Sequence, residues 1–306
     1  MKIVALTGGV GGAKLADGLA QIIKPRDLTI VVNTGDDFEY LGLSISPDLD
    51  TVCYTLAGIS NPETGWGRIG DTFNILEIVH QLGGPSWFHL GDQDLATQLE
   101  RTRLLRAGQS LSQITHDFCK AWAVQCSVIP MTDQVVRTFV DTLEYGELAF
   151  QEYFVHHHCE PIVKGFRFNG IENALPTPGL LDAFEQSDAV VFCPSNPWVS
   201  IDPILAIPGI RTAITKKCTV AVSPLINGHA VKGPAAKMFL EMGIPPSVSA
   251  IAQHYENLLS GFILDIHDSN LSSELKIPFL TTNTLMKTSD DRQHLAEDVL
   301  HLIENL

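Results

Sequence analysis

The first 15 residues of the chain, MKIVALTGGVGGAKL (1–15), decide the fold class. An apolar run at 2–6 leads directly into a glycine-rich stretch, and the apolar spacing over 13–23 is typical of a helix packed on a sheet. Residues 28–32, LTIVV, form a second apolar run, as expected for a strand that is covered on both faces. Strand, glycine turn, helix and strand together predict one right-handed βαβ unit of a parallel sheet.

The same alternation of strands and helices resumes near residue 178. The run at 219–222 predicts one of several further strands, and the spacing over 247–259 predicts one of the helices. We therefore predict an α/β protein with a doubly wound, mostly parallel, Rossmann-like sheet. Its core comprises 1–90 and 178–306, and 91–177 forms an inserted helical and β subdomain.

Composition and charge exclude several classes of protein. The chain has 306 residues, of which 45% are hydrophobic and 18% charged, a balance that excludes disorder. The net charge of −15 argues against nucleic acid or an anionic membrane as a partner. No apolar run approaches about 20 residues, and no secretory signal precedes the first strand, so we expect a cytoplasmic protein. The six cysteines include no CxxC pair and are predicted to be reduced thiols.

The glycine-rich turn is the strongest candidate for binding a phosphate. Glycines let the backbone approach an anion, and the start of the helix directs free N–H groups at it. The predicted binding residues are Thr7, Gly8, Gly9, Gly11, Gly12 and Lys14. Neither standard fingerprint is matched, because Lys14 stands where a dinucleotide-binding loop has its third glycine and no Ser or Thr follows this lysine. A tight turn without a ligand is the structural alternative.

Four aspartates follow the second predicted strand, in NTGDD (33–37) and SPDLDT (46–51). Carboxylates at the carboxyl end of a strand bind a ribose or hold Mg²⁺, which prefers oxygen ligands. We assign the metal to Asp36, Asp48 and Asp50, a cofactor-binding role to Asp37, and the reacting centre to Asp50 with Asp36. Which of the four bind metal stays open, and capping of a helix over 51–57 is the alternative for Asp48 or Asp50.

Two later loops carry polar residues where strands end. CPSNP (193–197) and SPLING (223–228) follow apolar strands, and ligands of open α/β sheets bind outside such ends. Ser195, Asn196 and Asn227 are therefore predicted to bind the nucleotide. Lys232 precedes a predicted helix start and is assigned to a second anion site. Two ordinary connecting loops are the alternative.

Three further features are weaker signals. His89 is predicted to end a strand and to border the site, with a structural histidine as the alternative. Arg68 is a candidate phosphate contact. The run His156-His157-His158 suggests zinc, but consecutive side chains point in different directions, so no zinc site is expected and the role of the run stays open.

Seven segments, taken together, resemble the 2-phospho-L-lactate transferase family of coenzyme F420 biosynthesis. They are TGGVGGAKL (7–15), VNTGDDFEYLGLSISPDLDTVCYTLAG (32–58), WGRIGDTF (66–73), LGDQDLATQLERT (90–102), PMTDQVVRT (130–138), CPSNPWVSIDPILAIPGIR (193–211) and SPLINGHAVKGPAAKM (223–238). The similarity extends from residue 2 to about residue 268 and keeps one order, so it is specific.

The resemblance implies a transferase that moves 2-phospholactate from lactyl-2-diphospho-5′-guanosine to a deazaflavin alcohol, 7,8-didemethyl-8-hydroxy-5-deazariboflavin (Fo). GMP leaves, coenzyme F420-0 forms, and Mg²⁺ is the implied cofactor. Related members use a phosphoenolpyruvyl donor, and the sequence does not separate the two donors. It also leaves the oligomeric state open, a homodimer included. Phe38 and Tyr40 would face the deazaflavin ring unless they belong to the core.

The residues themselves agree with direct phosphoryl transfer, which needs positioning and charge neutralisation but no nucleophile on the enzyme. Two other classes stay open. A nicotinamide-dependent reductase is suggested by the βαβ start, although the missing third glycine opposes it. A non-catalytic nucleotide sensor would bind GDP tightly and show no turnover.

Overall fold

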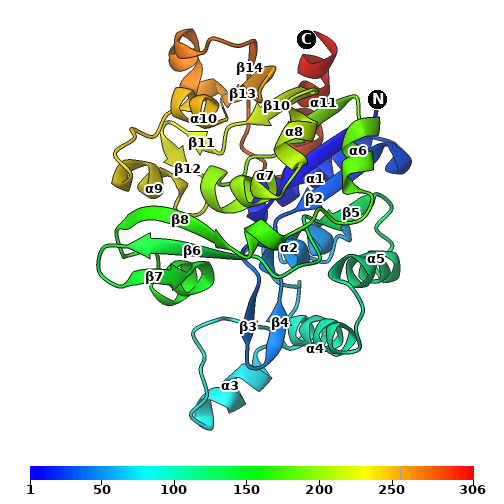
Figure 1. The fold of residues 1–306 in the computed structure, drawn as a ribbon, viewed down its shortest axis with the longest axis vertical. Helices are drawn as coiled ribbons and strands as arrows, with labels where there is room; N and C mark the ends of the chain where they lie inside the picture. The colour runs from blue at the N-terminus through cyan, green and yellow to red at the C-terminus, as the bar shows by residue number, and fades with distance from the viewer. Residues whose placement is uncertain (256) are drawn as a thin grey trace.

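Seven parallel strands form the centre of the molecule, in the order β14-β13-β10-β9-β1-β2-β5 (Figure 1). The computed structural model of the chain describes residues 1–255 and 257–306. The strands are β1 Ile3–Thr7, β2 Leu28–Val32, β5 Ser127–Pro130, β9 Ala189–Phe192, β10 Cys218–Val222, β13 Gly261–Asp265 and β14 Phe279–Thr282. The strand order reverses direction at β1, so the predicted doubly wound α/β fold is confirmed.

Both faces of this sheet are buried, which explains the uninterrupted apolar sequence of β1. Ile3 and Ala5 point into a cluster with α1, α2, α5 and α11, whereas Val4 and Leu6 point into a second cluster with α6 to α10. The first set of helices is α1 Gly9–Ile22, α2 Pro47–Leu56, α5 Leu111–Ala121 and α11 Ser289–Glu304. The second set is α6 Leu180–Gln186, α7 Asp202–Ala206, α8 Ile210–Ile214, α9 Ala235–Glu241 and α10 Val248–His254.

Small elements extend from the carboxyl ends of the strands. After β2 come a hairpin and two helices, with bounds β3 Phe38–Tyr40, β4 Leu43–Ile45, α3 Asn74–Gln81 and α4 Asp92–Arg106. A separate antiparallel sheet of order β7-β6-β8 follows β5, with bounds β6 Arg137–Thr142, β7 Gly146–Ala149 and β8 Val163–Asn169. Between β7 and β8 lies a π-helix, Glu152–His156. A two-stranded hairpin, β11 Leu225–Ile226 and β12 His229–Ala230, follows β10.

The predicted insertion at 91–177 is not wholly outside the central sheet. Its strand β5 pairs in parallel with β2, from Thr29 opposite Ser127 to Val32 opposite Pro130. The antiparallel sheet of β6, β7 and β8 is the part of this range that stands apart from the central sheet. The division into 1–90, 91–177 and 178–306 stays a prediction, but β5, which lies within 91–177, belongs to the central sheet.

Three local predictions need correction. The helix predicted over 51–57 begins at Pro47, so Asp48 and Asp50 lie in its first turn and neither is its N-cap. Residues 87–90 form no strand, because their aromatic side chains pack as a cluster instead. The helix predicted over 247–259 ends at His254, and residue 256 of that range lies outside the described residues.

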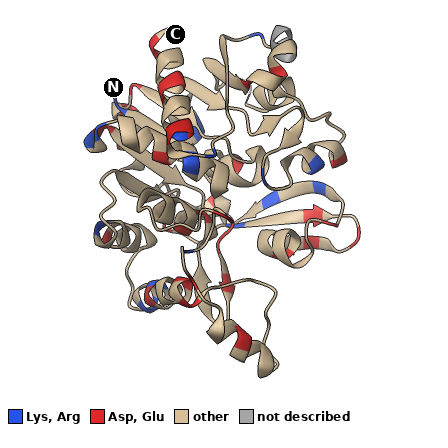
Figure 2. Cartoon of the chain, turned by 180° about the vertical axis from the view of Figure 1, so that it is seen from behind, with Lys and Arg blue, Asp and Glu red and all other residues tan. Residues whose placement is uncertain are grey.

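Along the ribbon of Figure 2, positions of Lys and Arg are interspersed with positions of Asp and Glu. All six cysteines are free. Within the described part of the chain, each helix is too short or too polar to cross a membrane.

Candidate functional site

A cavity of about 670 Å³ lies at the carboxyl ends of the central strands. Segments that follow five strands line it together, namely 8–11 after β1, Asp36 after β2, 194–196 after β9, 223–224 after β10 and 284–286 after β14. This is the position in which open α/β sheets bind ligands. The predicted site residues in its lining are Gly8, Gly9, Gly11, Lys14, Asp36, Asp48, Asp50, His89, Ser195, Asn196 and Lys232.

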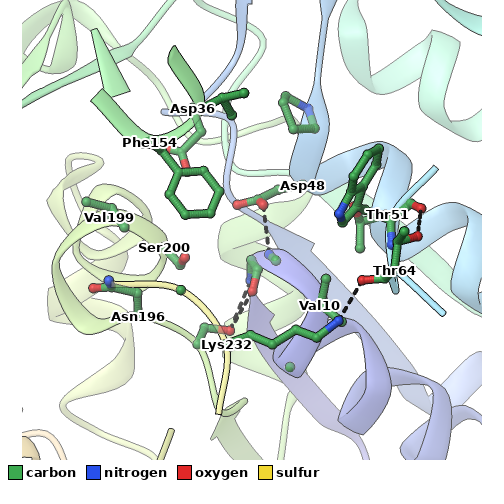
Figure 3. A pocket seen from close by; sticks show the side chains of 18 of the residues that line it. Val10, Asp36, Asp48, Thr51, Thr64, Phe154, Asn196, Val199, Ser200 and Lys232 are labelled. Atoms are coloured by element: carbon green, nitrogen blue, oxygen red, sulfur yellow. Dashed lines mark hydrogen bonds between the residues drawn. The ribbon is translucent and has the colours of Figure 1, made fainter. Parts of the chain in front are cut away.

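The glycine turn is held by one side chain from the loop after β9 and one from the first turn of α2. The backbone N–H of Gly8 donates to Oγ of Ser195 at 3.2 Å, and this hydroxyl donates back to the Gly8 carbonyl at 2.9 Å. The N–H of Gly9 donates to Oδ1 of Asp48 at 2.7 Å (Figure 3). A Cβ on Gly8 would lie 2.5 Å from Oδ2 of Asp48, and one on Gly11 would lie 2.5 Å from the Pro194 carbonyl oxygen. Close packing of the turn therefore already requires these glycines, before any ligand is considered.

Asp36 and Asp48 are buried carboxyl groups that face the same cavity (Figure 3). Oδ1 of Asp36 is buried and has no hydrogen-bond partner among the described residues. Burial, and then the nearby Asp48 carboxylate, raise the pKa of Asp36 well above its usual range. Burial also raises the pKa of Asp48 to about 6, although Asn33 and Gly9 donate hydrogen bonds to it. Two buried acids to which no described Lys or Arg is bonded form a place where a cation would bind favourably.

Asp50 has the opposite surroundings. Its carboxylate is clamped by Arg101, whose Nη2 contacts Oδ1 and whose Nη1 donates to Oδ2 at 3.1 Å. Nε2 of Gln98 donates to the same Oδ2 at 2.7 Å. Asp50 is 6% exposed and Arg101 is 3% exposed, so this ion pair is buried. Asp50 lines the cavity with both of its carboxylate oxygens already hydrogen-bonded.

No role was predicted for Arg101, although the sequence of α4 contains a pattern that indicates a buried polar face. Asp94, Gln98 and Arg101 are spaced i, i+4 and i+7, and all three are buried. Polar residues at this spacing occupy one face of a helix. Asp94 accepts a hydrogen bond from the Tyr54 hydroxyl at 2.7 Å. The inward face of α4 is thus a polar network that supports α2.

Two lysines lie near the glycine turn. Nζ of Lys14 donates to the Met286 carbonyl at 2.7 Å, and Nζ of Lys232 donates to the Thr64 carbonyl at 2.6 Å, as Figure 3 shows beside Val10. Burial, and then the charges of Arg292 and Lys232, lower the pKa of Lys14. Both lysines line the cavity. They offer positive charge at one end of it.

Four of the predicted residues lie outside the lining of the cavity, namely Thr7, Gly12, Asp37 and Asn227. Asp37 is buried and accepts a hydrogen bond from Oγ of Ser46 at 2.7 Å, and burial raises its pKa to about 7. Asn227 has a positive φ of 52° in the turn between β11 and β12, where its N–H donates to Asp268. Asn196, by contrast, borders the cavity, and its side-chain oxygen caps the turn that begins at Pro197.

The other end of the cavity is aromatic and was missed in the sequence. Its lining includes Trp87, Phe88, Phe150, Phe154 and His158. Phe88 and Phe150 are 62 residues apart in the chain, so no local pattern could join them. Phe38 and Tyr40 do not line the cavity and pack against Trp87 and Phe88 instead, with ring centroids 4.9 to 6.0 Å apart.

The rings of His156 and His157 stack on each other with centroids 5.2 Å apart, so these two side chains do not diverge as the sequence predicted. His156 stacks on Trp87 with ring centroids 5.3 Å apart, and His157 packs against Tyr145. Among the described residues, no group of three or more His, Cys, Asp or Glu side chains is arranged to hold a metal ion. Mg²⁺ usually takes one or two carboxylates together with substrate phosphates and water, and the Asp36 and Asp48 pair fits that smaller ligand set.

Comparison with known proteins agrees with this arrangement of segments. The model of the family described as 2-phospho-L-lactate transferase CofD matches residues 3–304. A phosphoenolpyruvate transferase of Streptomyces griseus is 40% identical over 316 residues, covering 98% of this chain and 99% of its own. A 2-phospho-L-lactate transferase of Methanosarcina acetivorans is 37% identical over 309 residues, covering 99% and 100%.

A solved structure shares the fold at much lower identity. A crystal structure of a UPF0052 family protein from Bacillus halodurans has a TM-score of 0.64 and 15% identity, covering 98% of each chain. Because the family model spans nearly every residue from β1 to α11, the chain belongs to the 2-phospho-L-lactate transferase CofD family and is a transferase.

Proposed function

We propose that this protein transfers a phosphorylated three-carbon acid, 2-phospholactate or its enolpyruvyl analogue, from a diphosphoguanosine donor to the ribityl hydroxyl of the deazaflavin Fo in F420 biosynthesis. The observation that carries the proposal is the layout of one cavity. Its lining combines Lys14, Lys232 and a helix start with aromatic side chains and the buried carboxyl groups of Asp36 and Asp48. Figure 3 draws Phe154 and Lys232 on different sides of Asp48.

The cationic end suits a nucleoside diphosphate. Gly9, Val10 and Gly11 open α1 toward the cavity, and Lys14 and Lys232 add positive charge. A helix start with nearby cations binds phosphate oxygens. The loops after β9 and β10 that carry Asn196 and Ser223 would then hold the guanosine.

The aromatic end suits the flat ring of the acceptor. Trp87, Phe88 and Phe154 offer ring faces and edges, which favour stacking on an aromatic ligand. With the acceptor at this end and the diphosphate at the other, the ribityl chain points toward Asp36 and Asp48. That geometry brings a hydroxyl to the phosphorus that carries the acid, as in-line displacement requires.

Asp36 and Asp48 would hold Mg²⁺, which when bound neutralises the oxygens of the diphosphate. In the transfer, the ribityl oxygen forms a bond to the acid-bearing phosphorus while the bond to the GMP oxygen breaks. The hydroxyl proton passes to a carboxylate, and Asp36 is our candidate because it lines the cavity and its Oδ1 has no hydrogen-bond partner among the described residues. Asp50, bound to Arg101, holds α2 in place and no longer serves as the first choice for the reacting group.

The test is a transfer assay with Fo, Mg²⁺ and each donor in turn, read by mass spectrometry of the deazaflavin product. We expect a phosphodiester product with at least one donor, and the ratio of the two rates assigns the acid. A companion measurement compares melting temperatures with GDP and with ADP, and GDP should give the larger shift. Absence of product with both donors, despite tight GDP binding, would favour the nucleotide sensor.

A further inference from the structure

A second cavity, of about 410 Å³, adjoins the first. Both cavities share Thr64, Trp66, Gly67 and Asp94, so the stretch 64–67 forms the boundary between them. The chain from 61 to 71 supplies most of the second lining, and its Lys or Arg residue is Arg68. The proposed transfer assigns no group of the donor or the acceptor to this second cavity.

The side chain of Arg68 has no hydrogen-bond or ion-pair partner in the part of the chain that the structure describes. Its Nε is buried without a hydrogen bond, and its guanidinium forms no ion pair there. The other cations that line these cavities differ, since Lys14 and Lys232 each donate to a backbone carbonyl. The buried Nε–H of Arg68 has lost its contact with water and has gained no hydrogen bond in return, which costs free energy. An anion that accepted this hydrogen bond would offset that cost.

The acidic residues beside Arg68 are committed to other groups. Asp71 accepts backbone N–H groups of Thr72 at 2.8 Å, Gln93 at 2.7 Å and Asp94 at 3.1 Å. Asp94 accepts the Tyr54 hydroxyl at 2.7 Å. Both carboxylates therefore stabilise the start of α4 and its network, and neither is bonded to Arg68.

Arg68 lines the second cavity and not the main one, but it packs on Tyr54, which lines the main cavity. Its guanidinium carbon is 5.5 Å from the ring centroid of Tyr54, and Tyr54 lines the main cavity together with Asp48 and Thr51 of the same helix face. Asp48 and Tyr54 are six residues apart on α2, which corresponds to about 9 Å along the helix axis. The guanidinium therefore lies at the Tyr54 end of this helix face, and a change of the Arg68 rotamer past Tyr54 would turn it toward the acid bonded to the reacting phosphorus.

We propose that Arg68 binds the carboxylate of the three-carbon acid carried by the donor. The proposal rests on the proposed function. It concerns the carboxylate of the donor's acid, because the groups that bind the diphosphate leave this carboxylate without a partner. Lys14, Lys232 and the start of α1 serve the diphosphate, whereas the planar fork of an arginine matches a carboxylate with two parallel hydrogen bonds. Arg68 is thus a specificity residue for an acid-bearing donor.

The first experiment compares two donors in the transfer assay. One is lactyl-diphosphoguanosine, and the other is isopropyl-diphosphoguanosine, in which a methyl group replaces the carboxylate. With Arg68→Gln, kcat/KM should fall roughly 10–100-fold for the acid donor and less than about 3-fold for the isopropyl donor. Arg106→Gln is the matched control, because Arg106 is exposed on α4 and donates only to the Gly42 carbonyl. Equal losses with both donors, or no loss, overturn the proposal.

A binding experiment keeps the two proposals separable. Calorimetric titration with 2-phospholactate and with isopropyl phosphate, in the presence of GMP and Mg²⁺, measures the carboxylate alone. We expect the wild type to prefer 2-phospholactate by roughly 10-fold or more, and Arg68→Gln to abolish that preference with an unchanged circular dichroism spectrum. A wild type that transfers neither the lactyl nor the enolpyruvyl donor refutes the proposed function, while the titration still decides the subsite. Preference retained in Arg68→Gln, or absent in the wild type, refutes the role of Arg68.

Discussion

Asp48 and Asp50 lie two residues apart on α2, yet their surroundings are opposite. Asp48 shares a buried space with Asp36, no cation is bonded to either carboxylate within the described residues, and burial raises both pKa values. Asp50 is held by two nitrogens of Arg101 and by Gln98. One turn of α2 therefore carries two different carboxylates. Asp48 has no cation bonded to it among the described residues, whereas Asp50 is paired with Arg101.

The difference separates groups kept for ligands from groups kept for structure. A carboxylate buried without a cation costs stability in the free protein, and such groups concentrate at functional sites. A carboxylate in a hydrogen-bonded buried ion pair is costly only when its partner is removed. The comparison thus predicts loss of activity from changes at Asp36 and loss of stability from changes at Asp50.

The largest effect is expected from Asp36→Asn. Turnover should fall roughly 10²–10⁴-fold, because the change removes a ligand for the cation and the candidate proton acceptor. The melting temperature without Mg²⁺ should stay the same or rise, since the amide relieves repulsion with Asp48. Steady-state rates against Mg²⁺ concentration and a thermal melt measure both. Glu39→Gln, an exposed acid on β3, is the control, and wild-type turnover of Asp36→Asn at every Mg²⁺ concentration would contradict this role.

Asp50→Asn should act mainly on the fold. It leaves the guanidinium of Arg101, which is 3% exposed, without its carboxylate, and breaking a buried pair costs about 3–5 kcal/mol of unfolding free energy. Urea denaturation measures the change. The double variant Asp50→Asn with Arg101→Met should recover part of the loss, because no unpaired charge remains.

The surface pair of Asp141 and Lys164 provides the control for that experiment. Its side chains are 46% and 47% exposed, so Asp141→Asn should change stability by less than about 1 kcal/mol. Stability of Asp50→Asn equal to that of Asp141→Asn would show that the Arg101 pair is not structural.

The pH dependence of stability tests Asp94, whose carboxylate accepts hydrogen bonds from Tyr54 and Gln98 beside the Asp50–Arg101 pair. Burial, and then the charge of Asp50, raise its pKa to about 6. Between about pH 4 and pH 6 the folded state therefore binds more protons than the unfolded state, so unfolding free energy falls as pH rises and then levels off. The contribution is on the order of 2–3 kcal/mol. Asp94→Asn should remove it, and the test compares urea midpoints of both proteins from pH 4 to 8. Parallel pH curves would mean that Asp94 stays ionised.

The start of the fold could be predicted well because its signals are local. The apolar runs of β1 and β2 and the glycine turn between them all lie within residues 1–32, and the predicted strands match the structure within two residues. The start of α1 was harder, since Gly9, Gly11 and Gly12 have low helix propensity. Asp48 compensates by accepting the Gly9 N–H, a contact that joins residues 39 positions apart.

The site could be predicted only where its residues follow strands. Parallel strands bring their carboxyl ends to one edge, so the sequence predicted that Gly8, Asp36, Ser195 and Lys232 belong near each other, and the structure places them on one cavity. It could not distinguish Asp48 from Asp50, because the partner of Asp50 lies 51 residues further along the chain. The aromatic lining residues could not be grouped from the sequence either, because they come from separate segments, 87–88 and 150–158.

The smallest expected effect belongs to Lys232, the exposed cation opposite the buried acids. In the free protein its Nζ donates to the Thr64 carbonyl at 2.6 Å, and a donor phosphate would take over this hydrogen bond. Lys232→Ala should therefore lower kcat/KM roughly 10–100-fold, mostly through KM, as the loss of one charge-assisted contact predicts. Stability should change by less than about 0.5 kcal/mol. Added salt should reduce the difference between wild type and variant, because an exposed charge is screened. Lys216→Ala, at another exposed position, controls for net charge. Equal kinetics of the two variants would assign Lys232 to the solvated surface and leave the phosphate to Lys14 and the start of α1.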